Sequence, residues 1–410
     1  MNAITRWLLI EGRRASDLQP LMLATIEQYR RDEIGVPIDR LWAGTLLLHP
    51  QAAAYFWVWE RDRPDEMLER ELSYARFAEL DDRDSPARRL RNGASSVRAR
   101  LRDRDEPHEL EELETLRQHG YTDFFALPLL FRGAFAGAFT WATRAPDGFS
   151  GEHLELLEAT LPALSAVVEP LAREQATATL LRTYLGPNAG EQVLSGQVRR
   201  GDGQTIRAAI WFCDIRGFTR LTGAIDQTTL LGLLSDTFEV IVKQLAAHGG
   251  EVLKFMGDGV LAIFPERRPG EVAEEGARPT ARVCAAAYRA TEAVLRELAA
   301  VHETRRAAGL PVAPIGVGLH HGDVMYGNIG APARLDFTVI GMAVNVAARI
   351  EGLCGELARD VLASRRFADS CGGPTTRVGE FALKGVAERV EIYALELATP
   401  DRARAQEPPP

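Results

Sequence analysis

The spacing of apolar residues over the first 172 positions predicts helices on either side of a group of strands. Apolar residues recur with a helical period at 17–33 and again at 148–172. Runs rich in aromatic and aliphatic residues lie between these helices and predict strands at 40–50, at 52–62 and in the two arms of a hairpin at 123–144. A stretch of this length is typical of one domain, so we expect it to fold as a separate unit.

The pattern between residues 203 and 398 predicts a second domain of mixed strands and helices. A buried strand that begins near Ile206 ends in Asp214 and a glycine turn, and an amphipathic helix follows at 228–250. Two apolar arms flank the sequence Gly-Asp-Gly, which predicts a tight hairpin with Asp258 at its tip. The remaining pattern predicts a strand–turn–strand at 312–330, a strand that leads into a helix at 334–355, and a hairpin at 381–395.

Composition and charge narrow the choice of protein class. The 410 residues are 46% hydrophobic and 26% charged, as in an ordinary globular protein. A formal net charge of −9, without a long basic stripe, argues against a nucleic-acid partner. No apolar run approaches the ~20 residues that a membrane span needs, and the N-terminal sequence does not resemble a signal peptide. The four cysteines are scattered, which fits a reducing compartment, so we expect a cytoplasmic protein.

Three further segments have a composition that differs from that of the predicted strands and helices. Residues 173–202 predict a helical linker that is broken at the sequence PNAG and has too few heptads for a coiled coil. Residues 85–107 are rich in arginine, but the interleaved acidic residues favour a solvated surface over a basic patch for an anionic partner. The proline-rich end, 399–410, predicts a disordered tail.

Two aspartates are the first candidates for chemistry. If the strand that ends in Asp214 is a neighbour of the hairpin, Asp214 and Asp258 meet at the same end of one sheet. Two carboxylates a few ångströms apart repel each other unless a proton or a metal ion lies between them. Oxygen ligands favour Mg²⁺ or Mn²⁺, which also bind substrate phosphates, so the pair indicates two-metal phosphoryl or nucleotidyl transfer. A lone aspartate at position 214 would more often only cap a strand-to-helix turn. The sequence has no GxxxxGK[ST] phosphate-binding loop.

Polar residues further along the chain have groups that suit a nucleotide. Asn345 and Arg349 are four residues apart on a predicted helix and therefore share a face. An amide suits a ribose hydroxyl and a guanidinium suits a phosphate; the alternative is an ordinary exposed polar stripe. Lys384 precedes a glycine in the last hairpin, where it is placed to reach phosphates, although a lone lysine there is usually only solvated.

Five motifs, in this order, make the second domain recognisable. They are FCDIRGFTRLT, GGEVLKFMGDGVLAIF, GNIG, FTVIGMAVNVAARIE and LKGVAERVEIY, spread over 212–393. Together they resemble the catalytic domain of the class III nucleotide cyclases, the adenylyl/guanylyl cyclase family. The sequence TYLGPNAGEQVL at 183–194 resembles the short element that often precedes such domains.

The first domain resembles a different family, and only in its pattern. Residues 126–169 are similar to the C-terminal half of a GAF domain, a small-ligand sensor built from an antiparallel sheet flanked by helices. No cysteine is placed to hold a chromophore. The resemblance therefore implies either a sensor of an unknown small ligand or a GAF-like fold that serves only for dimerisation.

The cyclase resemblance implies a ferredoxin-like α/β (α+β) sandwich that works as a head-to-tail homodimer with shared active sites. Asp214 and Asp258, assisted by the backbone carbonyl of Ile215, would hold two ions of Mg²⁺ or Mn²⁺. These ligands would come from one subunit, and the groups that bind the base and the transition state would come from the other.

The resemblance also assigns the groups that bind the substrate, ATP. Lys254 and Thr338 would contact the adenine, because lysine can donate to N1 and threonine can accept from the 6-amino group. Asn345 would orient the ribose, Arg349 would stabilise charge on the α-phosphate, and Lys384 would hold the triphosphate. Guanine reverses both base requirements, and guanylyl members carry Glu and Cys at the two base positions. The expected activity is therefore conversion of ATP to 3′,5′-cyclic AMP and pyrophosphate.

Three details qualify the resemblance. The Lys–Thr pair is typical of a subgroup that often responds to bicarbonate, which is a hypothesis for this chain. Met342 replaces an aspartate that is common in the motif, and we expect it to tune activity rather than abolish it. His320 and His321 are expected in a surface turn, so neither is expected to act as a general base.

These inferences divide the chain into a GAF-like regulatory domain (1–172), a helical linker (173–202), a cyclase catalytic domain (203–398) and a disordered tail (399–410). Three alternatives stay open. One is a guanylate cyclase, and another is a diguanylate cyclase, suggested by the Gly-Gly-acidic sequence at 249–251. The third is a catalytically silent, nucleotide-binding signalling dimer.

Overall fold

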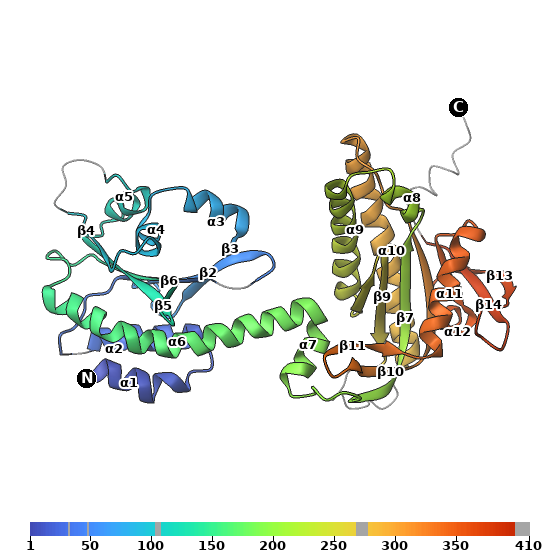
Figure 1. Cartoon of the computed structure of the whole chain (residues 1–410), viewed down its shortest axis with the longest axis horizontal. Helices are drawn as coiled ribbons and strands as arrows, with labels where there is room; N and C mark the ends of the chain where they lie inside the picture. The colour runs from blue at the N-terminus through green and yellow to red at the C-terminus, as the bar shows by residue number, and fades with distance from the viewer. Residues whose placement is uncertain (32, 47–48, 103–107, 268–277, 398–410) are drawn as a thin grey trace. The chain divides into compact units, whose positions relative to one another are not determined.

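The chain forms two compact units, described here separately, in a computed structural model (Figure 1). The units are Met1–Thr183 and Tyr184–Pro410, and the structure describes residues 1–31, 33–46, 49–102, 108–267 and 278–397. Within these ranges no helix has both the length and the apolar character that crossing a membrane requires. The expected disordered tail at 399–410 lies outside the described residues.

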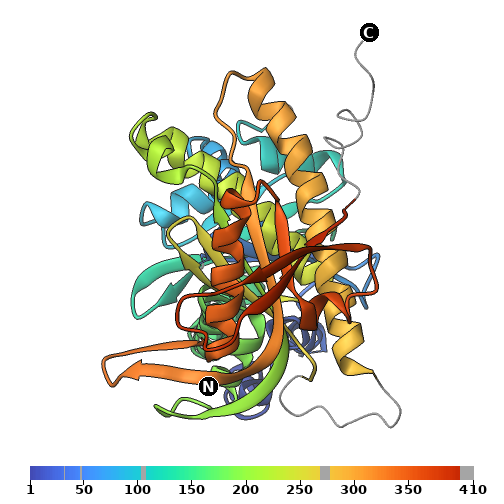
Figure 2. The same ribbon diagram turned by 90° about the vertical axis from the view of Figure 1, so that its right-hand side faces the viewer.

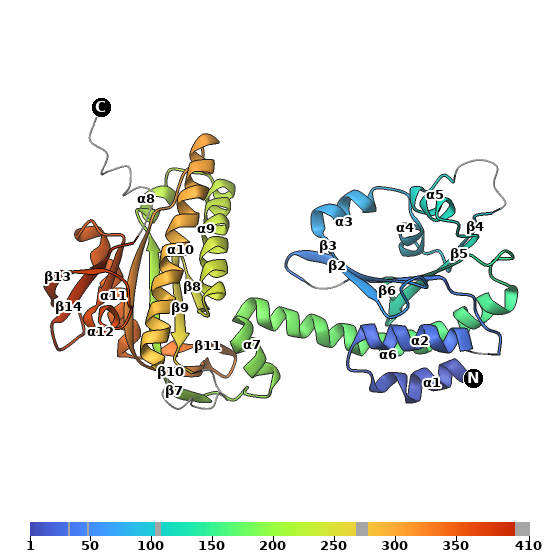
Figure 3. The same ribbon diagram turned by 180° about the vertical axis from the view of Figure 1, so that it is seen from behind.

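The first unit is a six-stranded antiparallel sheet with helices on both faces (Figures 1 and 3). Its strands, in the spatial order β3-β2-β1-β6-β5-β4, are β1 (Arg40–Leu46), β2 (Ala52–Glu60), β3 (Met67–Ser73), β4 (Val97–Arg100), β5 (Asp123–Phe131) and β6 (Ala134–Thr143). One face packs against α1 (Ala3–Ile10), α2 (Leu18–Arg31) and α6 (Gly151–Leu185). The other carries α3 (Tyr74–Asp81), α4 (Pro86–Arg91) and α5 (Glu111–Gln118).

Alternation along the strands explains this layering. Tyr55, Trp57 and Trp59 point from β2 into the larger core beneath α1, α2 and α6. The helix expected at 17–33 and the hairpin expected at 123–144 are confirmed as α2 and as β5 with β6. β3 was not expected, because its sequence MLERELS is mostly charged and lies exposed at the sheet edge.

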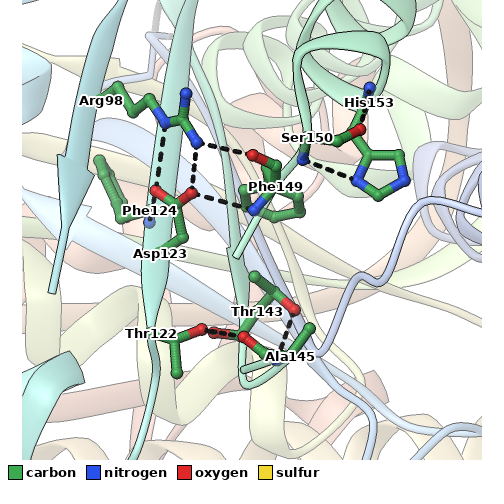
Figure 4. A network of polar contacts seen from close by, with 9 residues as sticks. All are labelled: Arg98, Thr122, Asp123, Phe124, Thr143, Ala145, Phe149, Ser150 and His153. Atoms are coloured by element: carbon green, nitrogen blue, oxygen red, sulfur yellow. Dashed lines mark hydrogen bonds and ion pairs between the residues drawn. The ribbon is translucent and has the colours of Figure 1, made fainter. Parts of the chain in front are cut away.

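A buried carboxylate holds together β4, β5 and the start of α6 (Figure 4). Arg98 donates to both oxygens of Asp123 and also to the carbonyl of Phe149, and the Phe149 N–H donates to Asp123 at 3.0 Å. At the next residue the Ser150 hydroxyl accepts from the N–H of His153, which caps α6. A charge buried this deeply is stable only when paired and hydrogen-bonded, so this network serves the fold.

The linker contains a continuous helix and a short second one. α6 continues to Leu185, and the chain then turns at Gly186, whose φ of 90° suits glycine. Pro187 begins α7 (Pro187–Leu194). The expectation that the helix breaks at PNAG is therefore confirmed: the break lies at Gly186, and proline favours the first turn of the new helix.

The second unit is a mixed α/β fold around an eight-stranded sheet. Its elements are β7 (Gly203–Ile215), α8 (Phe218–Thr222), α9 (Gln227–Ala247), β8 (Glu251–Met256), β9 (Gly259–Pro265), α10 (Pro279–Ala307), β10 (Ile315–Ala331), β11 (Arg334–Ile340), α11 (Met342–Glu356), β12 (Val361–Ser364), α12 (Arg365–Ala368), β13 (Thr375–Phe381) and β14 (Val390–Leu395). The order β10-β7-β9-β8, with α9 and α10 as connections, is the expected ferredoxin-like arrangement. β12, β14 and β13 extend the sheet beyond β10, and β11 pairs with the far end of β10.

The central strands β7 and β10 run side by side over most of their length (Figure 2). Alternate residues of β7, such as Ala209, Trp211 and Cys213, pack against α9 and α10. The residues between them, Ala208 and Ile210, pack with α7, β11 and α11 on the opposite face. Since both faces are covered, most side chains of these strands are apolar, and the polar ones in their interior, His320 and His321, are buried.

β10 corrects one expectation. Residues 312–330 do not form a strand, a turn and a second strand, because β10 is one strand of 17 residues. Its glycines do not form a turn: they allow α11 to lie against the strand. A Cβ at Gly322 would lie 2.8 Å from the Cβ of Ala343, and one at Gly318 would lie 2.5 Å from the backbone nitrogen of Glu351 and overlap the Ala347 carbonyl oxygen.

Gly318→Ala tests this close packing. The added methyl group must push α11 away from β10, and we expect the second unit to lose on the order of 2 kcal/mol of unfolding free energy. Amide hydrogen exchange of β10 and α11 measures this loss separately from the first unit. The matched control is Gly352→Ala on the same helix, where no atom lies within 4 Å and the change should be neutral or stabilising. Equal exchange rates in the two variants would contradict the packing argument.

Candidate active site

Asp214 and Asp258 lie at the same end of the second sheet. Asp214 is next to last in β7, and Asp258 lies in the tight turn between β8 and β9. β7 pairs with β9, with Cys213 opposite Val260, so the turn reaches the end of β7. Met256 pairs with Gly259, which makes Gly257 and Asp258 the turn residues, one position earlier than an Asp-Gly turn. The expectation that the strand and the hairpin are neighbours is confirmed.

Asp258 perturbs Asp214. Partial burial, a hydrogen bond with Asp258 and the negative charge of Asp258 together raise the pKa of Asp214 to about 6. The N–H of Ile215 donates to Asp214 and acts in the opposite direction. Such a pair has to share a proton or bind a cation at neutral pH. The structure thus brings together the three residues expected at the metal site.

Two glycines flank Asp214. Gly316 pairs with Asp214 across β10 and β7, and a Cβ at Gly259, on the other side, would lie 3.5 Å from Asp214 Oδ1. The side chain of Ile215 is buried toward α9 and α10, so only its backbone is available at this end. Carboxylate and carbonyl oxygens in an open space suit Mg²⁺ or Mn²⁺. Among the described residues no three acidic, histidine or cysteine side chains are grouped to hold a metal, so any further ligands would come from backbone, water or substrate.

The two expected base-binding residues lie on neighbouring elements. Lys254 lies on β8 and Thr338 lies on β11. The Lys254 ammonium forms an ion pair at 2.6 Å with Asp336 of β11, a residue that the sequence analysis missed. This ammonium lowers the pKa of Asp336. Because residues two apart on a strand point to the same side, Asp336 and Thr338 share a face of β11. The two-residue spacing of Asp336 and Thr338 on a predicted strand was the sequence signal that could have identified Asp336.

Asn345, Arg349 and Lys384 are separate from the aspartates. Asn345 and Arg349 are exposed on one face of α11, and Lys384 is exposed in the loop between β13 and β14. Within the described ranges no hydrogen bond or ion pair joins any of the three to Asp214 or Asp258. One chain therefore shows two groups of candidate residues rather than one closed site.

The expectation that His320 and His321 lie in a surface turn is wrong. Both are buried in the middle of β10, where His320 Nδ1 lies 2.7 Å from the Ser364 hydroxyl and His321 Nε2 lies 2.9 Å from Glu266. Burial lowers the pKa of His320 to about 4. Burial also lowers the pKa of His321, although Glu266 opposes this. Each has an internal partner, so both are part of the fold.

Comparison with known proteins identifies the second unit. Residues 203–396 match the family model of the adenylate and guanylate cyclase catalytic domain. This part of the chain is therefore a class III nucleotide cyclase catalytic domain. The comparison does not extend to the first unit, so its GAF-like character stays a prediction.

Relatives cover only part of the chain. The adenylate cyclase of Anabaena cylindrica is 29% identical over 214 residues, which are 50% of this chain and 39% of that protein. Adenylate cyclase 1 of Rhizobium meliloti is 32% identical over 184 residues, 44% of this chain and 26% of that protein. The chain thus spans less than half the length of either relative. The crystal structure of the adenylyl cyclase CyaB from P. aeruginosa gives a TM-score of 0.43 at 27% identity, covering 49% of this chain and 98% of that one.

The buried histidine predicts a pH dependence of stability. His320 stays neutral in the folded state down to about pH 4, whereas in the unfolded chain it binds a proton below its ordinary pKa of 6.5. Stability is therefore fully present above pH 6.5 and is lost as the pH falls toward 4, by up to about 3 kcal/mol. His320→Asn keeps a polar group near Ser364 but cannot titrate. Its unfolding free energy, from hydrogen exchange of β10, should fall less steeply over this range; an unchanged slope would contradict the assignment.

Proposed function

We propose that the chain is an adenylate cyclase that converts ATP to 3′,5′-cyclic AMP and pyrophosphate. The observation that carries the proposal is the ion pair of Lys254 with Asp336 beside Thr338, within a cyclase catalytic domain. Asp336 pairs with the Lys254 ammonium and shares a face of β11 with Thr338, so a donor and an acceptor would be available for adenine N1 and its 6-amino group. Guanine presents a donor and an acceptor in the reverse positions and would leave both groups unpaired.

The aspartate pair has the chemistry that this reaction needs. Asp214, Asp258 and the carbonyl of Ile215 would hold two ions of Mg²⁺ or Mn²⁺, and the raised pKa of Asp214 beside Asp258 supports a site for positive charge. When bound, such ions lower the pKa of the ribose 3′-hydroxyl and neutralise the departing pyrophosphate. The protein residues fix these oxygens on a buried strand and a tight turn, which keeps them in place before substrate binds.

The remaining candidate residues are exposed, and within the described part of the chain their polar groups form no hydrogen bond or ion pair with another side chain. Asn345 would orient the ribose, Arg349 would stabilise the charge that develops on the α-phosphate, and Lys384 would bind the triphosphate. A guanidinium and an ammonium suit these two roles because the first binds oxygens in pairs and the second acts as a mobile point charge. Leu383 is buried and anchors the loop that carries Lys384.

Exposed apolar side chains support a homodimer with shared sites. Met325 and Ile340 pair across β10 and β11 and are 44% and 50% exposed, and Met342 follows at the start of α11. Phe255 and Met256 are exposed next to Lys254 on β8. Apolar residues grouped around a polar site are typical of a protein interface. A second copy, placed head to tail, would bring its Asp214 and Asp258 to the Asn345–Arg349 face of the first.

The alternatives lack comparable support. Gly249 and Gly250 lie at the end of α9, before β8, and not in the hairpin turn, which argues against a diguanylate cyclase. Guanylate cyclase activity would place the Lys254 ammonium against a guanine donor. Regulation through the GAF-like unit and α6, a response to bicarbonate and a cytoplasmic location belong to the proposal without an observation of their own.

The primary test is product formation. The purified chain with ATP and Mn²⁺ or Mg²⁺ should yield 3′,5′-cyclic AMP, measured by chromatography, and GTP should be at least ~100-fold poorer. Asp258→Ala should abolish activity, because one carboxylate alone cannot hold the ions. If the wild type forms no more cyclic AMP than this variant, the chain is not a cyclase.

Complementation tests the shared site. Asp214→Ala and Arg349→Ala should each be inactive alone, but a mixed dimer has one site in which both groups are intact. If half of the dimers are mixed, about a quarter of wild-type activity should return. A mixture of Asp214→Ala and Asp258→Ala is the control, because every site then lacks one metal ligand. Verified mixed dimers without activity would argue against a shared site.

A further inference from the structure

Glu351 lies behind the aspartate pair, although no motif singled it out. A Cβ at Gly316 would lie 2.6 Å from Glu351 Oε1, so the carboxylate occupies the space that this glycine leaves. Gly316 is the pairing partner of Asp214, and directly opposed residues of an antiparallel pair point to the same face. The side chains of Asp214 and Glu351 therefore share the α11 face of the sheet.

The electrostatics agree with this placement. Burial and the charges of Asp214 and Asp258, opposed by Arg216, raise the pKa of Glu351 to about 7. In the part of the chain that the structure describes, no side chain donates a hydrogen bond to Glu351. A carboxylate that is partly buried, repelled by two others and not hydrogen-bonded is costly to the fold. Nothing in the packing of α11 requires it, since Gly316 would accommodate a smaller neutral side chain there.

Arg216 gives only partial compensation. Its guanidinium donates to the carbonyl of Arg359 and pairs with Asp360 at 3.1 Å, which fixes it at the end of β7. Its Nε is buried and has no partner among the described residues. The region thus holds three carboxylates against one arginine that is already paired elsewhere, which leaves an excess of negative charge.

We propose that Glu351 is a positioning residue for the metal ions: its charge strengthens cation binding at Asp214 and Asp258 without direct ligation. No third acidic side chain among the described residues is grouped with the pair closely enough to form a metal site, so Glu351 acts from behind the ligands. Side chains that lie directly behind metal ligands commonly change metal affinity about 10–100-fold. The inference rests on the proposed function for the identity of the cations, but its first test needs no nucleotide.

The placement gives α11 two roles. Glu351 is two residues after Arg349, which puts it on nearly the opposite side of a helix with 3.6 residues per turn. Asn345 and Arg349 are exposed, whereas Glu351 faces β10 and the aspartates of its own chain. In the proposed dimer one helix would then stabilise the metal ligands of one site and bind substrate in the other.

The test is direct measurement of Mn²⁺ binding to the full chain by electron paramagnetic resonance, without nucleotide and with non-cyclisable 3′-deoxy-ATP. Glu351→Gln should weaken Mn²⁺ binding about tenfold. Glu351→Asp should keep most of the affinity, because it keeps the charge. Glu356→Gln, an exposed glutamate on the same helix, should bind like the wild type. Asp214→Asn defines the signal of a lost ligand.

Two further measurements separate this role from a structural one. At pH 8 without metal, Glu351→Gln should unfold at a higher temperature than the wild type, because one of three repelling charges is gone. In turnover, it should need about tenfold more Mg²⁺ for half-maximal rate but reach a kcat within about twofold of the wild type at saturation.

The outcomes are distinct from those of the proposed function. Unchanged Mn²⁺ affinity in Glu351→Gln, or a wild type that binds no Mn²⁺ under either condition, would overturn the inference. A reduced kcat with an unchanged Mg²⁺ requirement would also overturn it, since Glu351 would then act in another way. A wild type that binds Mn²⁺ but forms no cyclic AMP would refute the cyclase proposal. The Mn²⁺ affinity of Glu351→Gln would then still decide whether Glu351 strengthens cation binding.

Discussion

The close contact between α11 and β10 is the constraint on which the candidate site depends. Gly322, Gly318 and Gly316 meet in turn Ala343, Ala347 and Glu351, so the helix lies along a strand that has no side chains to hold it away. This contact fixes the rotation of α11. It turns the apolar residues inward, exposes Asn345 and Arg349, and places Glu351 over Gly316. Larger residues at these three glycine positions would weaken the core and would also change which residues of α11 are exposed.

Charge is distributed along this scaffold in two separate places. Negative charge gathers at the end of β7, where Asp258 and burial raise the pKa of Asp214, and burial together with both aspartates raises the pKa of Glu351. The cationic side chains of Arg349 and Lys384 lie elsewhere and are exposed. Among the described residues of one chain, the two groups of charges form no ion pair with each other. Their separation is consistent with a site completed by a second copy, in which the two sets come together only around metal and nucleotide.

The sequence predicted what depends on local pattern and missed what depends on packing. The hairpin with Asp258 and the strand that ends in Asp214 follow from periodicity and turn residues, and the ferredoxin-like order follows from the family motifs. The glycines of β10 predict a turn from sequence alone, because the helix that they allow to pack closely, α11, lies further along the chain. For the same reason His320 and His321 were expected on the surface. The roles of Asp336 and Glu351 could not be identified from sequence, because each role depends on which charged residues the fold brings beside them.

The start of β8 shows how the linker becomes part of the catalytic unit. Glu251 is buried, accepts from the amide of Asn188 on α7 at 3.0 Å and accepts from the Tyr326 hydroxyl of β10 at 3.0 and 3.2 Å. A buried carboxylate needs such donors, so α7 cannot leave the sheet without exposing or stranding this charge. Lys254 follows three residues later on the same strand. This contact of α7, within the second unit, therefore fixes one end of the strand that carries Lys254.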